Sequence, residues 1–172
     1  MPSNPHKNHY MNLGHTLMGV LYAYTNNCQK AEEYVQQAIK DASLTITDST
    51  DLSNAYVYHK EQFLQTLHAN GQIKEICYEN TGDINDLKQA WTNYIAIIDF
   101  VENVRNGFAA KAAKQDLNNS VRIYYTKATS IAMKLYQLTK DKTYLNKAFQ
   151  ISDKGKSILL HEELLTLSLI HI

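Results

Sequence analysis

The sequence predicts an all-α fold built from about three antiparallel helix pairs. Three observations support this prediction. The 172-residue chain has only 2 prolines and 6 glycines, which favours long helices over strands and turns. Apolar residues recur at spacings of three and four, as on one face of an amphipathic helix. A helix–turn–helix segment occurs twice, at an offset of 58 residues. A chain of this length suits one domain, so residues 1–172 are expected to form a single helical unit.

The repeated segment contains the end of one helix, a polar turn and the start of the next. Residues 77–90 (CYENTGDINDLKQA) align without a gap with residues 135–148 (LYQLTKDKTYLNKA). Asp83 and Asp141 are expected to cap the helices that follow, and Gly82 to take the left-handed conformation that ends a helix. The five shared positions are Tyr78, Thr81, Asp83, Leu87 and Ala90, matched by Tyr136, Thr139, Asp141, Leu145 and Ala148.

In chain order, the periodicity predicts six helices, at about 9–25, 28–43, 55–80, 84–106, 117–139 and 142–165. They pair as three hairpins, at about 9–43, 55–106 and 117–165. Residues 44–51 and 106–115 are the expected connections, and a break in the third helix is expected near Asn70–Gly71. Residues 166–172 fit no helix face, so a frayed or foreign tail is expected there.

The apolar faces follow from the same spacing. In the first hairpin, Leu17, Met18, Leu21 and Tyr22 are expected to face inward, against a second helix that Asn26 or Asn27 caps. The other expected inward sets are Ala31, Val35, Ala38, Ile39 and Ala42; Leu87, Ala90, Trp91, Tyr94, Ile97, Ile98 and Val101; and Val121, Tyr124, Tyr125, Ala128, Ala132, Leu135 and Leu138.

Composition limits the class of protein. Hydrophobic residues make up 44% of the chain, which argues against disorder. There is no signal peptide and no apolar run long enough to span a membrane. Cys28 and Cys77 belong to no zinc-binding spacing and fall on apolar faces, so free thiols and a cytoplasmic location are expected.

Charge is unevenly distributed although the formal net charge is zero. Residues 1–104 carry 6 Lys and Arg against 12 Asp and Glu, and residues 105–172 carry 11 against 5. Drift in surface composition accounts for this best. The basic half is weak evidence for nucleic-acid binding, because no aromatic–basic motif accompanies it.

Three short motifs suggest chemistry, and each has a simpler structural explanation. The run Gly155-Lys156-Ser157 resembles the end of a phosphate loop, but position 150 is Gln and the run lies within a predicted helix. Gly155 is therefore expected to allow close helix packing. His6, His9 and His15 lack the further ligands of a metal site. The pairs Glu32–Glu33 and Glu162–Glu163 diverge by about 100° on a helix. No catalytic, metal or cofactor site is expected.

The first hairpin resembles a tetratricopeptide repeat. Met18-Gly19 and Tyr22 match the large–small pair and the aromatic of its first helix, although Leu13-Gly14 offers a competing register. Ala31, Val35 and Ala38 match its second helix, while Ser43 stands where a Pro usually ends the repeat. The resemblance implies a tetratricopeptide-like α–α superhelix of about three helix pairs, a protein-binding architecture.

The later hairpins are similar to the repeats that precede the caspase-like CHAT peptidase domain in bacterial proteins. The similarity rests mainly on residues 136–165, and especially on the helix KAFQISDKGKSILLHEELL, which in that family leads into the peptidase. The peptidase module would follow Ile172, so the resemblance implies the regulatory or sensing repeats alone. A downstream CHAT domain is an expected partner.

A protein-interaction scaffold with no enzymatic activity is thus the expected function. The candidate peptide groove is a stripe opposite the apolar face of one helix, formed by Arg122, Thr126, Lys127, Thr129, Met133 and Gln137. An uncapped C-terminal edge with Leu159, Leu160, Leu164, Leu165 and Leu167 would favour self-association. The alternatives are an enzyme with an unrecognised helical active site and, less favoured, a nucleic-acid-binding helical repeat.

Overall fold

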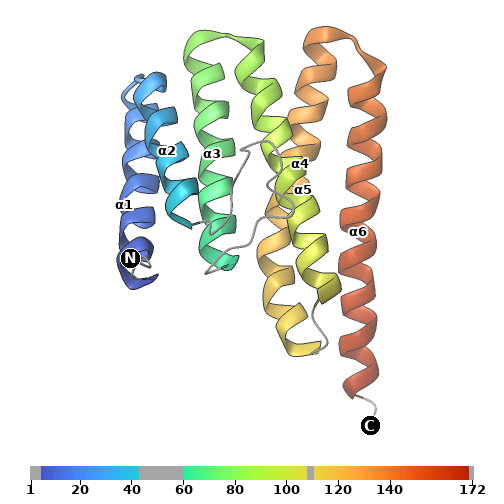
Figure 1. Cartoon of the computed structure of the whole chain (residues 1–172). Helices are drawn as coiled ribbons and strands as arrows, with labels where there is room; N and C mark the ends of the chain where they lie inside the picture. The colour runs from blue at the N-terminus through green and yellow to red at the C-terminus, as the bar shows by residue number, and fades with distance from the viewer. Residues whose placement is uncertain (1–4, 43–59, 108–110, 171–172) are drawn as a thin grey trace. The chain divides into compact units, whose positions relative to one another are not determined.

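A computed structural model describes the backbone of residues 5–42, 60–107 and 111–170, and the side chains of residues 9–42, 60–103 and 121–157. These residues contain helices and no strand, which confirms the all-α prediction (Figure 1). The chain divides into two compact units, Met1–Phe100 and Val101–Ile172. The helices are α1 (Pro5–Tyr24), α2 (Cys28–Ala42), α3 (Lys60–Thr81), α4 (Ile84–Gly107), α5 (Lys111–Thr139) and α6 (Lys142–Ile170).

Several boundaries differ from the prediction. Helix α5 begins at Lys111 and not near residue 117, because the stretch KAAKQ consists of good helix formers. Helix α6 continues to Ile170, beyond the predicted end near residue 165, since no Gly or Pro follows Gly155 to end the helix. Whether residues 166–172 fray or are foreign stays a prediction. Helix α3 passes unbroken through Asn70–Gly71. The predicted connection at 44–51 lies outside the described residues.

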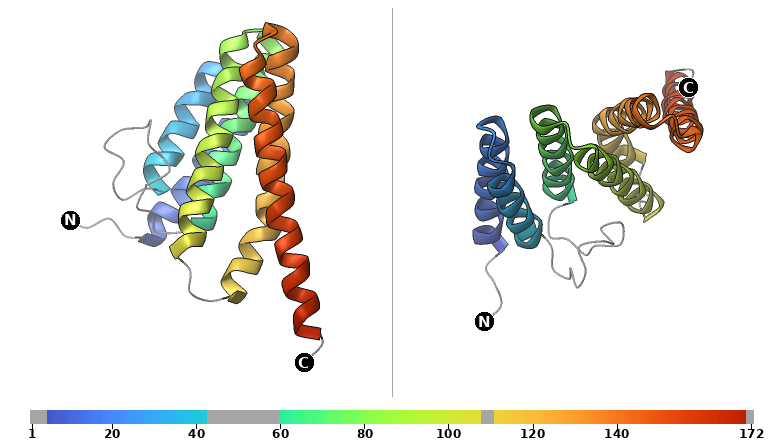
Figure 2. Two further views of the ribbon diagram at one scale, coloured as in Figure 1. Left: turned by 90° about the vertical axis from the view of Figure 1, so that its right-hand side faces the viewer. Right: turned by 90° about the horizontal axis from the view of Figure 1, so that it is seen from above.

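In the first unit, α1, α2 and α3 lie side by side, as Figure 1 and the view from above in Figure 2 show. Their shared core is formed by Ala23, Ala31, Val35, Ile73 and Cys77. Gly19 lies at a close contact of α1 with α2 and α3, because a Cβ added there would be 3.1 Å from both the Ala31 carbonyl oxygen and Ile73 Cδ1. Gly14, the glycine of the competing register, has open space around it.

The inward face of α1 is not the one that the sequence predicts. Leu17 and Leu21 are exposed, at 61% and 55%, while Asn12 and Ala23 are buried. Met18 and Tyr22 are only half-buried. The close crossing at Gly19 explains the difference, because small side chains let the helix backbones approach and the larger leucines are displaced to the outside.

A buried amide links α1 to both neighbouring helices. Asn12 Nδ2 donates to the carbonyl oxygen of Ala38 on α2, at 2.6 Å, and to Thr66 Oγ1 on α3, at 3.0 Å. Asn12 and Thr66 are each 1% exposed. Burying polar groups is costly unless they are hydrogen-bonded, and both amide protons are satisfied here.

A disulfide also joins the helices of this unit. Cys28 at the start of α2 is bonded to Cys77 near the end of α3, with a Cα–Cα distance of 5.8 Å. The prediction of free thiols is therefore wrong. The two cysteines are 49 residues apart in the sequence, and no local pattern predicts that the start of α2 and the end of α3 lie together.

Helices α3 and α4 contact through large rings and a buried lysine. Phe63 packs edge-on against Phe100, with the ring centroids 5.2 Å apart. A Cβ added at Gly71 would lie 2.8 Å from the Tyr94 ring, so glycine is needed there. Lys74, which is buried, pairs with Glu32 of α2 at 2.9 Å and with Asp86 of α4 at 3.4 Å.

The two turns of the sequence repeat have the same hydrogen bonds. The Thr81 and Thr139 hydroxyls accept from the backbone N–H of Asp83 and Asp141, at 3.1 and 3.2 Å. The two aspartates then accept from the backbone N–H two residues on, both at 2.9 Å, as N-caps do. The backbone bond from Thr143 and a second bond from its side chain lower the pKa of Asp141.

The turn after α1 is built differently. The N–H groups of Asn26 and Asn27 donate back to the carbonyls of Ala23 and Tyr22, at 3.0 and 2.8 Å, which is the Schellman pattern. Of the two candidate caps, Asn27 caps α2, since its Oδ1 accepts from the backbone N–H of Lys30 at 3.2 Å.

Replacing Lys140 by glycine is expected to stabilise the second unit. Gly82 and Lys140 hold the same left-handed place in the repeated turn, with φ of 75° and 59°, and that conformation costs a non-glycine residue about 1 kcal/mol. Thermal or urea unfolding of Lys140→Gly should show a gain of roughly this size, reduced by the entropy that glycine adds to the unfolded chain.

Lys88→Gly is the matched control, because Lys88 is exposed within α4 and glycine inside a helix costs about 1 kcal/mol. If both variants lost stability equally, the left-handed backbone at Lys140 would not be a strained position.

In the second unit, α5 and α6 pack as an antiparallel pair. Six of the seven predicted apolar positions of α5 are buried, whereas Leu138 is 50% exposed, near the end of the helix. Ala148 of α6 is buried, as the small residue of the repeat should be. No helix in the described part of the chain is long and apolar enough to cross a membrane.

Candidate functional site

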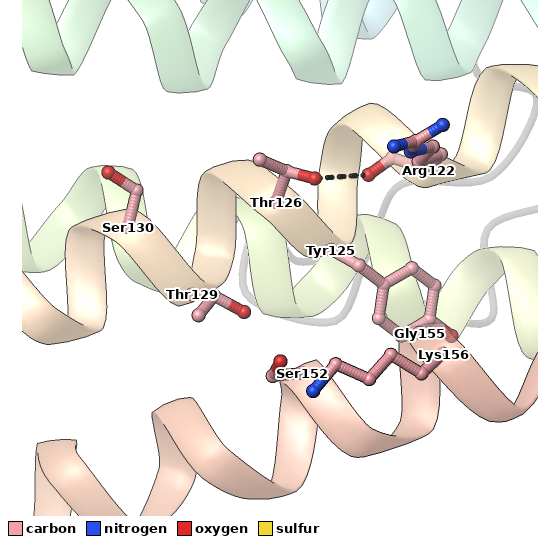
Figure 3. Close-up of a pocket in the computed structure, with 8 residues that line it drawn as sticks. All are labelled: Arg122, Tyr125, Thr126, Thr129, Ser130, Ser152, Gly155 and Lys156. Atoms are coloured by element: carbon pink, nitrogen blue, oxygen red, sulfur yellow. Dashed lines mark hydrogen bonds between the residues drawn. The ribbon is translucent and has the colours of Figure 1, made fainter.

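A cavity of about 420 Å³ lies between α5 and α6. This volume falls within the range of small-ligand and side-chain binding sites. Helix α5 contributes four polar residues and one ring, and α6 contributes three residues. The lining residues are Arg122, Tyr125, Thr126, Thr129, Ser130, Ser152, Gly155 and Lys156 (Figure 3).

The floor of the cavity is the contact between Tyr125 and Gly155. A Cβ added at Gly155 would lie 3.1 Å from Tyr125 Cβ and 3.2 Å from its Cγ. Gly155 therefore allows close helix packing, as the sequence predicts. The Tyr125 hydroxyl donates to Glu102 Oε1 at 2.9 Å, and Lys154 Nζ is 2.6 Å from the same oxygen. These bonds hold the Tyr125 ring in one orientation.

The walls carry hydroxyl groups from both helices. Thr126, Thr129 and Ser130 belong to α5, and Ser152 belongs to α6. The Thr126 hydroxyl is engaged, since it donates to the Arg122 carbonyl oxygen at 3.0 Å (Figure 3). Thr129 and Ser152 face the space between the helices, where hydroxyls can donate to or accept from a ligand.

The charge of the cavity is positive. Arg122 and Lys156 line it, and no Asp or Glu is among the described lining residues. None of the ion pairs in the described part of the chain involves either residue. Lys154 differs, because Glu102 neutralises it. In Figure 3 the Lys156 side chain runs along α6 and its ammonium group ends near Ser152.

Three of the six residues of the predicted groove line this cavity, namely Arg122, Thr126 and Thr129. The other three, Lys127, Met133 and Gln137, are not among the lining residues. Lys127 and Met133 are half-buried, and Gln137 is exposed on α5.

The sequence interpretation missed the contribution of α6. Ser152 and Lys156 lie four residues apart, a spacing that places them on one face of a helix. Gly155 lies between Ser152 and Lys156 in the sequence and packs against α5. The contact of Gly155 with α5 therefore places Ser152 and Lys156 beside the polar stripe of α5. The sequence shows the spacing of these residues, but it does not show that Gly155 contacts α5.

Of the three histidines considered as metal ligands, His9 and His15 have structural partners, and the side chain of His6 lies outside the described residues. His9 Nδ1 lies 2.6 Å from Gln62 Oε1, and His15 Nδ1 lies 2.6 Å from Asp41 Oδ2. Within the described residues, no group of three or more His, Cys, Asp and Glu side chains could hold a metal ion.

Comparison of the chain with protein-family models, curated proteins and solved structures yields no match. The residues of the cavity are therefore the basis for a functional proposal.

Proposed function

We propose that this chain is a protein-interaction module of tetratricopeptide-like helix pairs, which binds an acidic, extended peptide at the cavity between α5 and α6. The observation that carries the proposal is the lining of the cavity. Two cations, Arg122 and Lys156, accompany hydroxyl groups from two helices. Within the described residues, neither cation takes part in an ion pair, and the described lining contains no carboxylate.

Carboxylates are the best ligands for such a lining. A charged hydrogen bond to a carboxylate is worth more than one between neutral groups, and the serine and threonine hydroxyls can complete its shell. The proposal gives the lining residues a role in binding and assigns them no catalytic step.

Charge reversal in the cavity tests the proposal. A fluorescein-labelled Glu–Ser repeat peptide serves as the probe, and the Gln–Ser repeat of equal length is its neutral counterpart. Arg122→Glu and Lys156→Glu should each weaken binding of the acidic peptide roughly tenfold, because each replaces an attraction of about 1 kcal/mol with a repulsion. Fluorescence anisotropy at low and high salt measures the change.

Lys88→Glu is the control, since Lys88 is also exposed and does not line the cavity. It should bind the acidic peptide like the unmodified chain, apart from a small long-range charge effect that salt removes. Equal binding of the acidic and neutral peptides, or unchanged binding by Lys156→Glu, would refute the proposal.

We further propose that the module regulates a CHAT-type peptidase supplied by a downstream domain or another chain. The support is the similarity of residues 136–165 described above. The genomic sequence after the codon for Ile172 tests it. A reading frame that encodes a His/Cys peptidase there, or a neighbouring gene that does, agrees with the proposal, and the absence of both contradicts it.

A cytoplasmic location remains a prediction, and the Cys28–Cys77 disulfide weighs against it. Disulfides persist mainly in oxidising compartments. A free-thiol assay on the protein from its native source distinguishes a cytoplasmic location from an oxidising compartment. After denaturation, a cytoplasmic chain should show two reactive thiols, and a chain from an oxidising compartment should show none.

A further inference from the structure

The outward side of α1 carries an apolar stripe that no described residue covers. Six of the nine large hydrophobic side chains exposed in the described part of the chain lie on this one helix. Five of them, at spacings of 3, 4, 4 and 3 residues, fall within an arc of about 80° at 100° per residue. These five are Tyr10, Leu13, Leu17, Leu21 and Tyr24, exposed by 72%, 45%, 61%, 55% and 73%. We call them the α1 stripe.

The α1 stripe is symmetric about Leu17. Leu13 and Leu21 stand four residues before and after it, and Tyr10 and Tyr24 stand seven before and after it. A twofold interface requires that residue i contact residue j while j contacts i. In an antiparallel pair of α1 helices, Leu17 would face its own copy. Each Leu13 would then face Leu21, and each Tyr10 would face Tyr24.

Charge favours a second copy over other partners. Between His9 and Tyr24, α1 has no Asp, Glu, Lys or Arg, so the stripe offers nothing to a charged ligand. Two identical uncharged helices meet without repulsion.

The area is sufficient for a dimer. The five side chains expose roughly 600 Å² per copy, at the upper end of apolar patches on monomers. Two copies would together bury about 1,200 Å², which reaches the lower limit of standard specific interfaces. Gly14 lies beside the stripe with nothing within 4 Å of an added Cβ, so the facing helix can approach closely.

We propose that the α1 stripe is a homodimer interface, in which two α1 helices pack antiparallel across a twofold axis at Leu17. The interface shares no residue with the cavity of α5 and α6. It goes beyond the proposed peptide binding, and either proposal can fail without the other.

Sedimentation equilibrium over about a hundredfold range of protein concentration tests the interface. The unmodified chain should move from monomer to dimer. Leu17→Lys should shift the dissociation constant upward at least a hundredfold, because it places two ammonium groups together on the axis. Leu138→Lys changes a leucine that is 50% exposed on α5 and should dimerise normally. Circular dichroism checks that each variant is folded.

The pairing direction is tested with charges at Leu13 and Leu21. Leu13→Lys alone and Leu21→Glu alone should each weaken the dimer. The double variant should restore it, because each lysine then faces a glutamate of the other copy, whereas parallel helices would place like charges together. A monomer at all concentrations, a dimer that Leu17→Lys leaves intact, or a double variant as weak as the singles would each overturn the proposal.

Discussion

Replacing Cys28 and Cys77 together by alanine should lower the free energy of unfolding of the first unit by about 3–4 kcal/mol. The disulfide closes a loop of 49 residues, and a cross-link of this span removes entropy from the unfolded chain worth about 4 kcal/mol in the loop-closure model. Cys77 is 2% exposed, so the loss of its sulfur adds a small packing defect. Urea unfolding followed by circular dichroism measures the change.

Reducing agent supplies the control for the disulfide. Dithiothreitol should destabilise the unmodified chain and leave Cys28→Ala/Cys77→Ala unaffected. The disulfide would be shown not to form in solution by either of two results. One is an equal urea midpoint for the unmodified chain with and without reductant. The other is the titration of two free thiols in protein that has not been reduced.

Truncating Phe63 to alanine should cost about 3–5 kcal/mol, as is usual for a large ring removed from a core. The Phe63 side chain is fully buried, at 0% exposure, and contacts the Phe100 ring of α4 edge-on. The substitution therefore removes a contact between two helices as well as buried surface. The same urea titration gives the loss as a shift of the midpoint with a similar slope.

Phe149→Ala makes the same chemical change at a ring that is 63% exposed on α6. Its effect should stay within about 0.5 kcal/mol, as for most surface substitutions. A loss at Phe149 comparable with the loss at Phe63 would mean that burial does not determine the difference.

Much of the fold could be predicted from local patterns. Spacings of three and four placed the buried faces of α2, α4 and α5, and the repeated Thr-x-Asp turn was recognised with its capping aspartates. These features depend on residues close together in the chain, where side-chain periodicity and capping chemistry operate.

The features that the sequence did not reveal depend on helices meeting. Leu17 and Leu21 have the right spacing for a buried helix face. The small residues Gly19 and Ala23 form the contact of α1 with α2 and α3 instead, because the helix backbones approach closely there. The disulfide joins positions that are adjacent only in three dimensions. The cavity shows the same limit, since three residues of its α5 wall followed from periodicity while its α6 wall required knowledge of which faces meet.

The buried amide of Asn12 has a consequence for how the first unit selects one arrangement. Apolar contacts between helices tolerate small slides and rotations, whereas the bonds to Ala38 and Thr66 form in only one alignment of α1. A leucine at this position would fill similar space, and replacing a buried polar group by a well-packed apolar one often costs little stability. The unit would then lose one means of rejecting near-native alignments, so we expect Asn12 to contribute to structural uniqueness more than to the strength of packing.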